Sequence, residues 1–189
     1  MDQMLTHLLS ICLGLGLAAA CGFRVFVPGL VMSLATRAGY LELSDGFSWV
    51  GSTPALTVLI IATALEVGGY YIPWVDNLLD TVASPIAVVA GVLVTASVIT
   101  GMDPFMKWAL AIIAGGGVAA TTQALTAGTR GLSTVTTAGL GNPVVAAVEL
   151  GSSFAISVLA IVAPVLTVIL MIVAFIMWRR RRRRLTAQV

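Results

Sequence analysis

Charged side chains are scarce in this chain, and their scarcity separates it from soluble proteins. Only 10% of the 189 residues are Asp, Glu, Lys or Arg, whereas 59% are hydrophobic, and the mean hydropathy is +1.05. A soluble domain carries about 25% charged and about 45–50% apolar residues. Water cannot solvate this excess of apolar surface, so the composition excludes a soluble globular domain and predicts a membrane protein.

Histidine and cysteine are nearly absent, which argues against several classes of function. The chain has one histidine, His7, and two cysteines, Cys12 and Cys21, both in the first apolar run. Such a set favours neither a disulfide framework nor a metal site. No phosphate-binding loop, zinc signature or Ser-His-Asp order is recognisable in the sequence. We therefore expect no cofactor and no enzymatic activity.

The basic residues that are present gather at one place. Six of the ten Lys and Arg residues form the block Arg179–Arg184, directly after the last apolar run. A basic cluster beside a final span is the positive-inside signal, and it also attracts anionic lipid headgroups. We assign residues 1–178 to one transmembrane domain and residues 179–189 to a cytoplasmic tail that contacts lipid, not nucleic acid. A homo-oligomer is compatible with the sequence.

The apolar runs predict an all-α bundle of about six membrane-spanning helices, because a crossing needs about 20 apolar residues. The first run is interrupted by Pro28-Gly29, so it is either one kinked helix or two half-helices with an unwound middle. The last run is too long for one crossing, and Pro164 divides it; one long bent helix, giving five spans, is the alternative. The expected spans are 5–35, 54–71, 85–100, 105–125, 143–161 and 164–178.

The segment 72–84 differs from these runs because its apolar and polar residues alternate with helical spacing. This pattern predicts an amphipathic helix lying in the membrane interface, with Trp74 at headgroup depth. Asp76 and Asp80 lie one turn apart on its polar face. They form either a solvated face or a vestibule that attracts cations.

The distribution of Lys and Arg predicts the orientation. With six spans, the loop 126–142 that carries Arg130 lies on the same side as the Arg179–Arg184 block, whereas Arg37 and Lys107 lie outside. The positive-inside rule then places both termini in the cytoplasm.

Two glutamates in apolar runs occupy similar sequence contexts. Glu66 and Glu149 each follow an Ala by two positions and precede an aliphatic residue and a glycine. An acid at the centre of a membrane helix costs about 2.5–3.5 kcal/mol on insertion scales, so a matched pair indicates function. We predict an inverted repeat of three plus three spans, residues 5–101 and 105–178, whose halves meet at a shared site.

Arg24 is the remaining charge within an apolar run, and it should pair across the bundle with Glu66 or Glu149. One alternative is a static buried ion pair; the other is a gated site in which an acid takes up a proton and releases Arg24 to an anion. A third alternative is that the long Arg24 side chain extends to the membrane interface, where water solvates its charge. The central glycines Gly115, Gly116 and Gly117 either expose unwound backbone to the same anion or pack helices closely.

Several stretches resemble a family of bacterial integral membrane proteins known as a domain of unknown function. The resemblance covers most of residues 8–174, and it implies a multi-span protein of the bacterial inner membrane. In addition, the short stretch from Arg24 to Pro28 resembles the re-entrant segment of DedA-like lipid-carrier transporters. The stretches that carry the family resemblance are 22–30, 65–80, 114–117 and 139–143.

These observations together favour a small secondary transporter or flippase-like carrier of an anionic substrate, either free or lipid-linked. Arg24 would contact the anion, and Glu66 and Glu149 would couple its movement to protons. The first alternative is an ion channel lined by the glycine-rich segments. The second is a protein that organises the membrane without transport, its charges statically paired.

Overall fold

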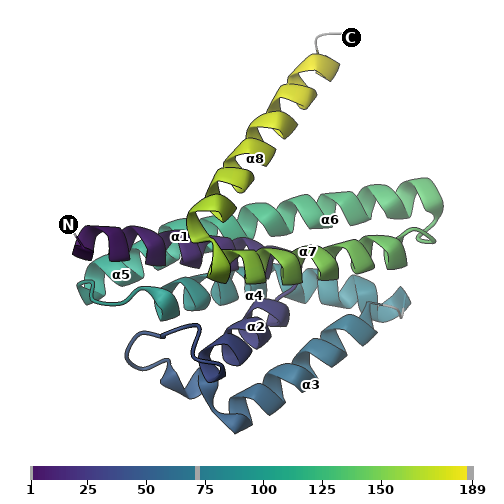
Figure 1. The fold of residues 1–189 in the computed structure, drawn as a ribbon. Helices are drawn as coiled ribbons and strands as arrows, with labels where there is room; N and C mark the ends of the chain where they lie inside the picture. Colours follow the sequence, from purple (N-terminus) through teal and green to yellow (C-terminus); the bar gives the residue numbers. More distant parts are fainter. Residues whose placement is uncertain (1, 71–72, 187–189) are drawn as a thin grey trace.

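The structure is a computed structural model that describes the backbone of residues 2–70 and 73–186, and the side chains of residues 3–70, 82–177 and 179. All regular secondary structure in this part of the chain is helical, which confirms the all-α prediction (Figure 1). The elements are α1 (Asp2–Phe23), α2 (Phe26–Arg37), η1 (Ser48–Gly51), α3 (Thr53–Gly69), α4 (Pro73–Val98), α5 (Pro104–Leu110), η2 (Ala111–Gly116), α6 (Gly117–Thr137), α7 (Asn142–Val162) and α8 (Pro164–Thr186).

The helices have the length and surface of a polytopic membrane protein. Three stretches are long and apolar enough to cross a bilayer, namely Gln3–Phe23, Pro104–Thr137 and Asn142–Val162. Other apolar helices are shorter, including Thr53–Gly69 and Val82–Val98. Large apolar side chains cover the outside of the bundle, where hydrocarbon, not water, would solvate them.

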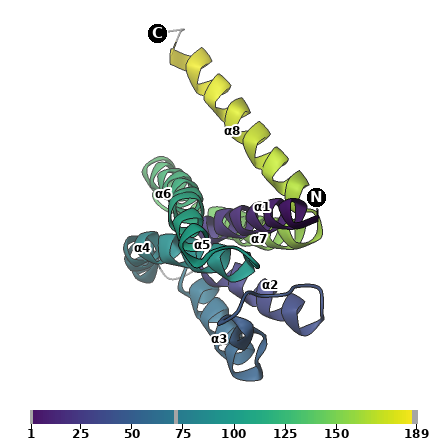
Figure 2. The same ribbon diagram turned by 90° about the vertical axis from the view of Figure 1, so that its left-hand side faces the viewer.

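Helix α1 lies at the centre of the bundle and packs against α4, α6 and α7. Residues 17–21 near its C-terminal end are almost completely buried. Helix α8 leans away on one side, and the α2–α3 pair projects on the opposite side (Figure 2). The end of α1 is therefore the position in the chain that is best shielded from lipid.

The chain breaks at Arg24 and Val25, between α1 and α2. A proline removes the hydrogen bond to the carbonyl four residues earlier and its ring collides with that carbonyl, which here belongs to Arg24. Pro28 is tolerated in the first turn of α2, where a missing N–H costs little. The prediction of two half-helices is confirmed, with the break four residues before the Pro28-Gly29 pair.

The α1–α2 pair forms a hairpin that returns to the end of the bundle where α1 begins (Figure 1). In the loop after α2, the Ser44 amide donates to the Ser97 carbonyl at 2.7 Å, near the end of α4. His7, near the start of α1, lies beside Gly101 in the turn that follows α4. The start of α1 and the loop after α2 therefore lie at the same end of the bundle, so residues 5–35 form a helical hairpin. Within this hairpin, Gln3–Phe23 is long and apolar enough to cross a bilayer.

The interfacial helix expected at 72–84 is not a separate element. Its described residues, from Pro73 onward, belong to α4, which continues through Pro85. Neighbouring helices allow a membrane helix to tolerate an internal proline, and sequence patterns do not report those neighbours. The side chains of Trp74, Asp76 and Asp80 lie outside the described residues. The expected cation vestibule at Asp76 and Asp80 is therefore not tested by the structure.

The prediction of a loop at 126–142 is also wrong for most of these residues, because α6 continues to Thr137. Threonine hydroxyls in this stretch donate to carbonyls four residues earlier, as Thr129 does to Leu125 at 2.9 Å. Such bonds satisfy a polar side chain within a helix, so a Thr-rich composition does not require a loop here.

The last apolar run is divided as predicted. Helix α7 ends at Val162, Ala163 has a non-helical backbone with φ −143° and ψ 70°, and α8 begins at Pro164. The inverted repeat expected from residues 5–101 and 105–178 stays a prediction.

Candidate functional site: a buried arginine pair at the helix break

The break frees backbone groups at the start of α2, and Glu66 of α3 satisfies them. The Val25 amide donates to one Glu66 carboxylate oxygen at 2.7 Å, and the Phe26 amide donates to the other at 3.1 Å. The N-terminus of a helix carries a partial positive charge, so a carboxylate is favoured there. Glu66 therefore acts as an internal anion that holds α2 in its returning direction.

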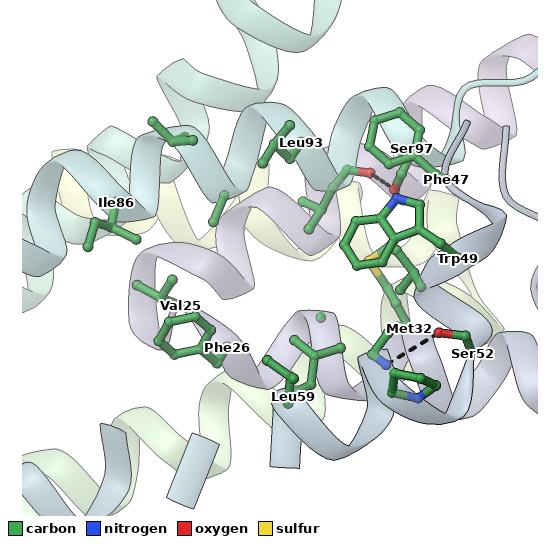
Figure 3. A pocket seen from close by; sticks show the side chains of 18 residues that line it. Val25, Phe26, Met32, Phe47, Trp49, Ser52, Leu59, Ile86, Leu93 and Ser97 are labelled. Carbon is green, nitrogen blue, oxygen red and sulfur yellow. Dashed lines mark hydrogen bonds between the residues drawn. The ribbon is translucent and has the colours of Figure 1, made fainter. Parts of the chain in front are cut away.

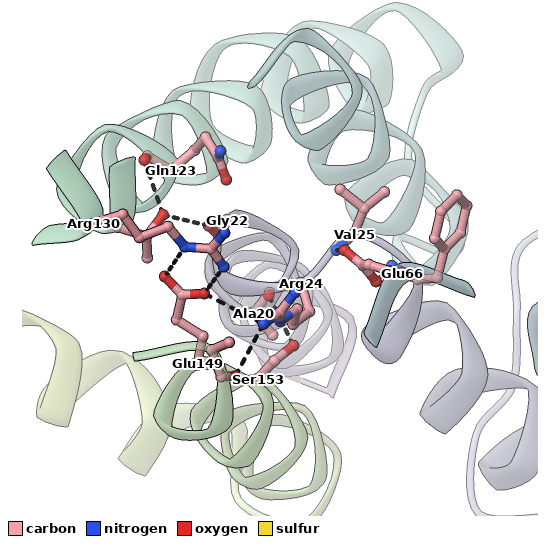
Figure 4. Close-up of polar contacts among 12 residues, drawn as sticks. Ala20, Gly22, Arg24, Val25, Glu66, Gln123, Arg130, Glu149 and Ser153 are labelled. Atoms are coloured by element: carbon pink, nitrogen blue, oxygen red, sulfur yellow. Dashed lines mark hydrogen bonds and ion pairs between the residues drawn. The ribbon is translucent and has the colours of Figure 1, made fainter. Parts of the chain in front are cut away.

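The carbonyls at the end of α1 are satisfied by hydroxyls from the neighbouring helices. Ser153 of α7 donates to the Ala20 carbonyl at 2.9 Å, and Thr126 of α6 donates to that of Gly22 at 3.3 Å (Figure 4). Gly22 permits this approach, because a Cβ there would lie 2.4 Å from the Cβ of Thr122. Both sides of the break are thus fixed by side chains from distant parts of the sequence.

Beside the break, Glu149 of α7 receives two arginines. Arg130 of α6 donates through Nε at 2.9 Å to one carboxylate oxygen and through Nη2 to the other, a bidentate pair (Figure 4). Arg24 reaches the same carboxylate at 3.5 Å and donates to the Ala146 carbonyl at 2.9 Å. All three charged residues are at most 5% exposed. The site is therefore fully inside the protein.

Tyr70, at the C-terminal end of α3, lies between the two guanidinium groups. The Cζ of Arg24 is 3.9 Å from its ring centroid, and that of Arg130 is 3.8 Å away. An aromatic ring attracts cations to both faces, which offsets part of the repulsion between the two arginines. Glu66 and Tyr70 lie one turn apart, so the last turn of α3 contacts both the helix break and the arginine pair.

The hydrogen-bond donors of Arg24 are only partly satisfied. Two guanidinium groups share the Glu149 carboxylate. Among the described residues, the Nε and Nη1 atoms of Arg24 have no hydrogen-bond acceptor, although both are buried. An unsatisfied buried donor costs about 1–3 kcal/mol, so an added anionic oxygen at these atoms would be favourable.

The structure brings together the three charged residues that the sequence singled out, and it selects Glu149 as the ion-pair partner of Arg24. It also adds two residues that sequence reasoning placed elsewhere. Arg130 was expected in a cytoplasmic loop, and Tyr70 was assigned no role in binding. One signal could have found Arg130, because Gln123, Thr126 and Arg130 follow helical spacing and are all buried.

The glycines Gly115, Gly116 and Gly117 keep a helical backbone and belong to η2 and the start of α6. A Cβ on Gly115 would lie 2.3 Å from the hydroxyl of Thr95 on α4. The geometry of Gly115 therefore supports close packing, the alternative to an unwound anion site, whereas a Cβ on Gly117 would meet nothing within 4 Å. Among the described residues, no group of three His, Cys, Asp or Glu side chains could hold a metal ion.

A helical hairpin with buried ion pairs at its tip, inside an apolar helical bundle, defines a polytopic membrane protein with an internal charged site. The chain belongs to the family described as domain of unknown function (DUF4126), which matches residues 11–183. The family resemblance drawn from the sequence is thereby confirmed. No curated protein and no solved structure matches the chain.

Proposed function

We propose that the protein is a small secondary transporter that binds an anion at the Arg24–Arg130 pair. The observation that carries this proposal is the shared carboxylate: two buried guanidinium groups have Glu149 between them, and Arg24 keeps two unsatisfied donors. Arginine binds carboxylate and phosphate oxygens in a bidentate manner, so these are the anions of choice.

Glu149 would act as the internal competitor of the substrate. While ionised, it holds Arg130 by two hydrogen bonds and Arg24 by a longer contact. If Glu149 took up a proton, its attraction for both guanidinium groups would fall, and a substrate anion could replace it. Movement of the anion and a proton in the same direction follows from this exchange, because binding either one favours binding the other.

The Arg179–Arg184 block supports a cytoplasmic C-terminal end in a bacterial inner membrane. The sequence also favoured a cytoplasmic N-terminus, but that assignment required residues 5–35 to cross the membrane. The α1–α2 hairpin, whose two ends lie at one end of the bundle, favours instead an N-terminus on the side of the loop that contains Ser44.

The channel alternative has less support, since Gly115 packs closely against Gly91 and Thr95 of α4. A static role remains the strongest competitor, because the same ion pairs also hold α1, α6 and α7 together. Transport and static pairing differ in whether Arg24 is needed for flux.

Reconstituted vesicles with an imposed pH gradient test the proposal, with uptake measured for a panel of small carboxylates, phosphates and fluorescent anionic lipids. We expect saturable, gradient-dependent flux of one of them that Arg24→Gln abolishes. Arg37→Gln is the matched control, because Arg37 is exposed at the end of α2. Unsaturable cation conductance would support the channel, and complete absence of flux from folded protein would support the static role.

A further inference from the structure

An open apolar groove begins at the helix break and runs between α2, α3 and α4. Its volume is about 580 Å³, and Val25 and Phe26 line it near one end, whereas Phe47 and Trp49 line it near the other (Figure 3). Phe47 and Trp49 belong to the segment between α2 and α3. The groove therefore leads from a loop at one end of the bundle to the tip of the α1–α2 hairpin.

The chemistry of the groove suits a hydrocarbon chain and not a polar solute. Its lining is almost entirely aliphatic and aromatic, and its two serines are already engaged. The Ser97 hydroxyl donates to the Val94 carbonyl at 2.8 Å, and the Ser52 hydroxyl oxygen accepts from the Ala55 amide at 3.3 Å. A polar occupant would lose its hydration at these walls without regaining hydrogen bonds.

The groove is open toward the surface that lipid covers. Val58 of α3 and Val89 of α4 both line it, and they are 64% and 57% exposed. A chain could therefore enter sideways from the bilayer, and no polar barrier would have to be crossed.

The inner end of the groove lies at the helix break, next to residues of the charged site, although no charged side chain lines the groove itself. Val25 and Phe26 line the groove, their amides hold Glu66, and the preceding residue is Arg24 with its unsatisfied donors. Two residues of the apolar lining thus follow directly after a buried cationic residue, whose guanidinium group is directed to Glu149 and the Ala146 carbonyl. This juxtaposition fits an amphiphile with one anionic end.

We infer that the anion bound by Arg24 is the phosphate headgroup of a membrane lipid whose hydrocarbon chain lies in the α2–α3–α4 groove. This inference rests on the proposed anion site and specifies its substrate class. The lipid would reach Arg24 laterally, with its headgroup passing the last turn of α3, where Glu66 and Tyr70 lie.

The test uses the full chain in phosphatidylcholine nanodiscs and a palmitoyl lysophosphatidic acid with a photoactivatable chain. Monopalmitoylglycerol with the same chain tests the role of the phosphate, and glycerol 3-phosphate tests the role of the chain. Val89→Trp fills the groove, and Val144→Trp is its matched control, since Val144 is 66% exposed on α7 and does not line the groove. Arg24→Gln removes the headgroup contact.

We expect crosslinks to α2 and α4, an affinity for lysophosphatidic acid that Val89→Trp lowers about tenfold, and little change with Val144→Trp. Arg24→Gln should weaken binding of lysophosphatidic acid but not of monopalmitoylglycerol. Crosslinks outside the groove, or equal affinities for both tryptophan variants, would overturn the inference.

The lipid inference and the transport proposal can fail separately. Flux of glycerol 3-phosphate that depends on Arg24 and ignores Val89→Trp would leave the transport proposal intact and overturn the lipid inference. Binding of lysophosphatidic acid in the groove that depends on Arg24, without any flux, would support the lipid inference and overturn transport.

Discussion

Glu149 receives two hydrogen bonds from Arg130 but only a 3.5 Å contact from Arg24. Removing one partner of a buried ion pair costs about 3–5 kcal/mol. We predict that Arg130→Gln lowers the free energy of unfolding by this amount and that Arg24→Gln lowers it by less, because Glu149 then keeps Arg130. Denaturant titrations in detergent measure both, with Arg37→Gln as the exposed control. A larger loss for Arg24→Gln would show that the pairing is assigned wrongly.

Each oxygen of Glu66 accepts one backbone amide, from Val25 and Phe26. A glutamine can accept only one of them, and its NH₂ group would face the other donor. We predict that Glu66→Gln costs about 1–3 kcal/mol of stability and accelerates hydrogen exchange at Val25 and Phe26. Glu42→Gln, at an exposed loop position, is the control. Unchanged exchange at these two amides would contradict the role of Glu66 at the break.

The sequence could nominate these residues but not their partners. A charge in an apolar run is visible from composition alone, and this singled out Arg24, Glu66 and Glu149. Arg130 was not identified as a buried charge because the surrounding sequence is rich in Thr and Gly, a composition typical of a loop. Only the packing of α6 against α1 and α7 shows that Arg130 is buried, and packing between distant segments is not encoded in local spacing.

At the scale of helices, Gly115 and Gly117 offer a matched pair of positions. A Cβ on Gly115 would collide with Thr95 and with the Gly91 carbonyl, whereas one on Gly117 would meet nothing within 4 Å. We predict that Gly115→Ala destabilises the protein by about 1–3 kcal/mol through overpacking. Gly117→Ala should be neutral or stabilising by up to about 1 kcal/mol, because alanine favours a helix.

Thermal unfolding of the two variants in one detergent provides the comparison. Equal effects would mean that α4 and η2 do not approach as closely as described, and would reopen the interpretation of these glycines as unwound backbone. A further loss of transport in Gly115→Ala at full stability would give the glycine a role beyond packing.

Helices were predicted best where proline sets a boundary, and worst where tertiary contacts override composition. Pro28 and Pro164 lie where helices break or begin, because a missing N–H acts locally. Pro85 does not end α4, and the Thr-rich stretch after Leu125 does not end α6. In both cases packing within the bundle determines where the helix ends, and this packing cannot be recognised from a single sequence.

For the whole molecule, the α1–α2 hairpin makes a prediction opposite to that of the sequence alone. His7 lies beside Gly101, and Ser44 is bonded to Ser97, so the start of α1, the loop after α2 and the turn after α4 share one end of the bundle. The turn between α6 and α7 lies at the other end (Figure 1).

We therefore predict that cysteines at Gln3 and Asp45 are accessible from the same side of the membrane, and that one at Leu140 is accessible from the opposite side. All three positions are exposed, and the native Cys12 and Cys21 would first be replaced by alanine. Labelling intact and permeabilised cells with a membrane-impermeant maleimide distinguishes the two sides. If residues 5–35 crossed the membrane, Gln3 would pair with Leu140 and not with Asp45. That outcome would also separate the tip of the hairpin from the bundle centre, and with it the basis for an anion site at Arg24.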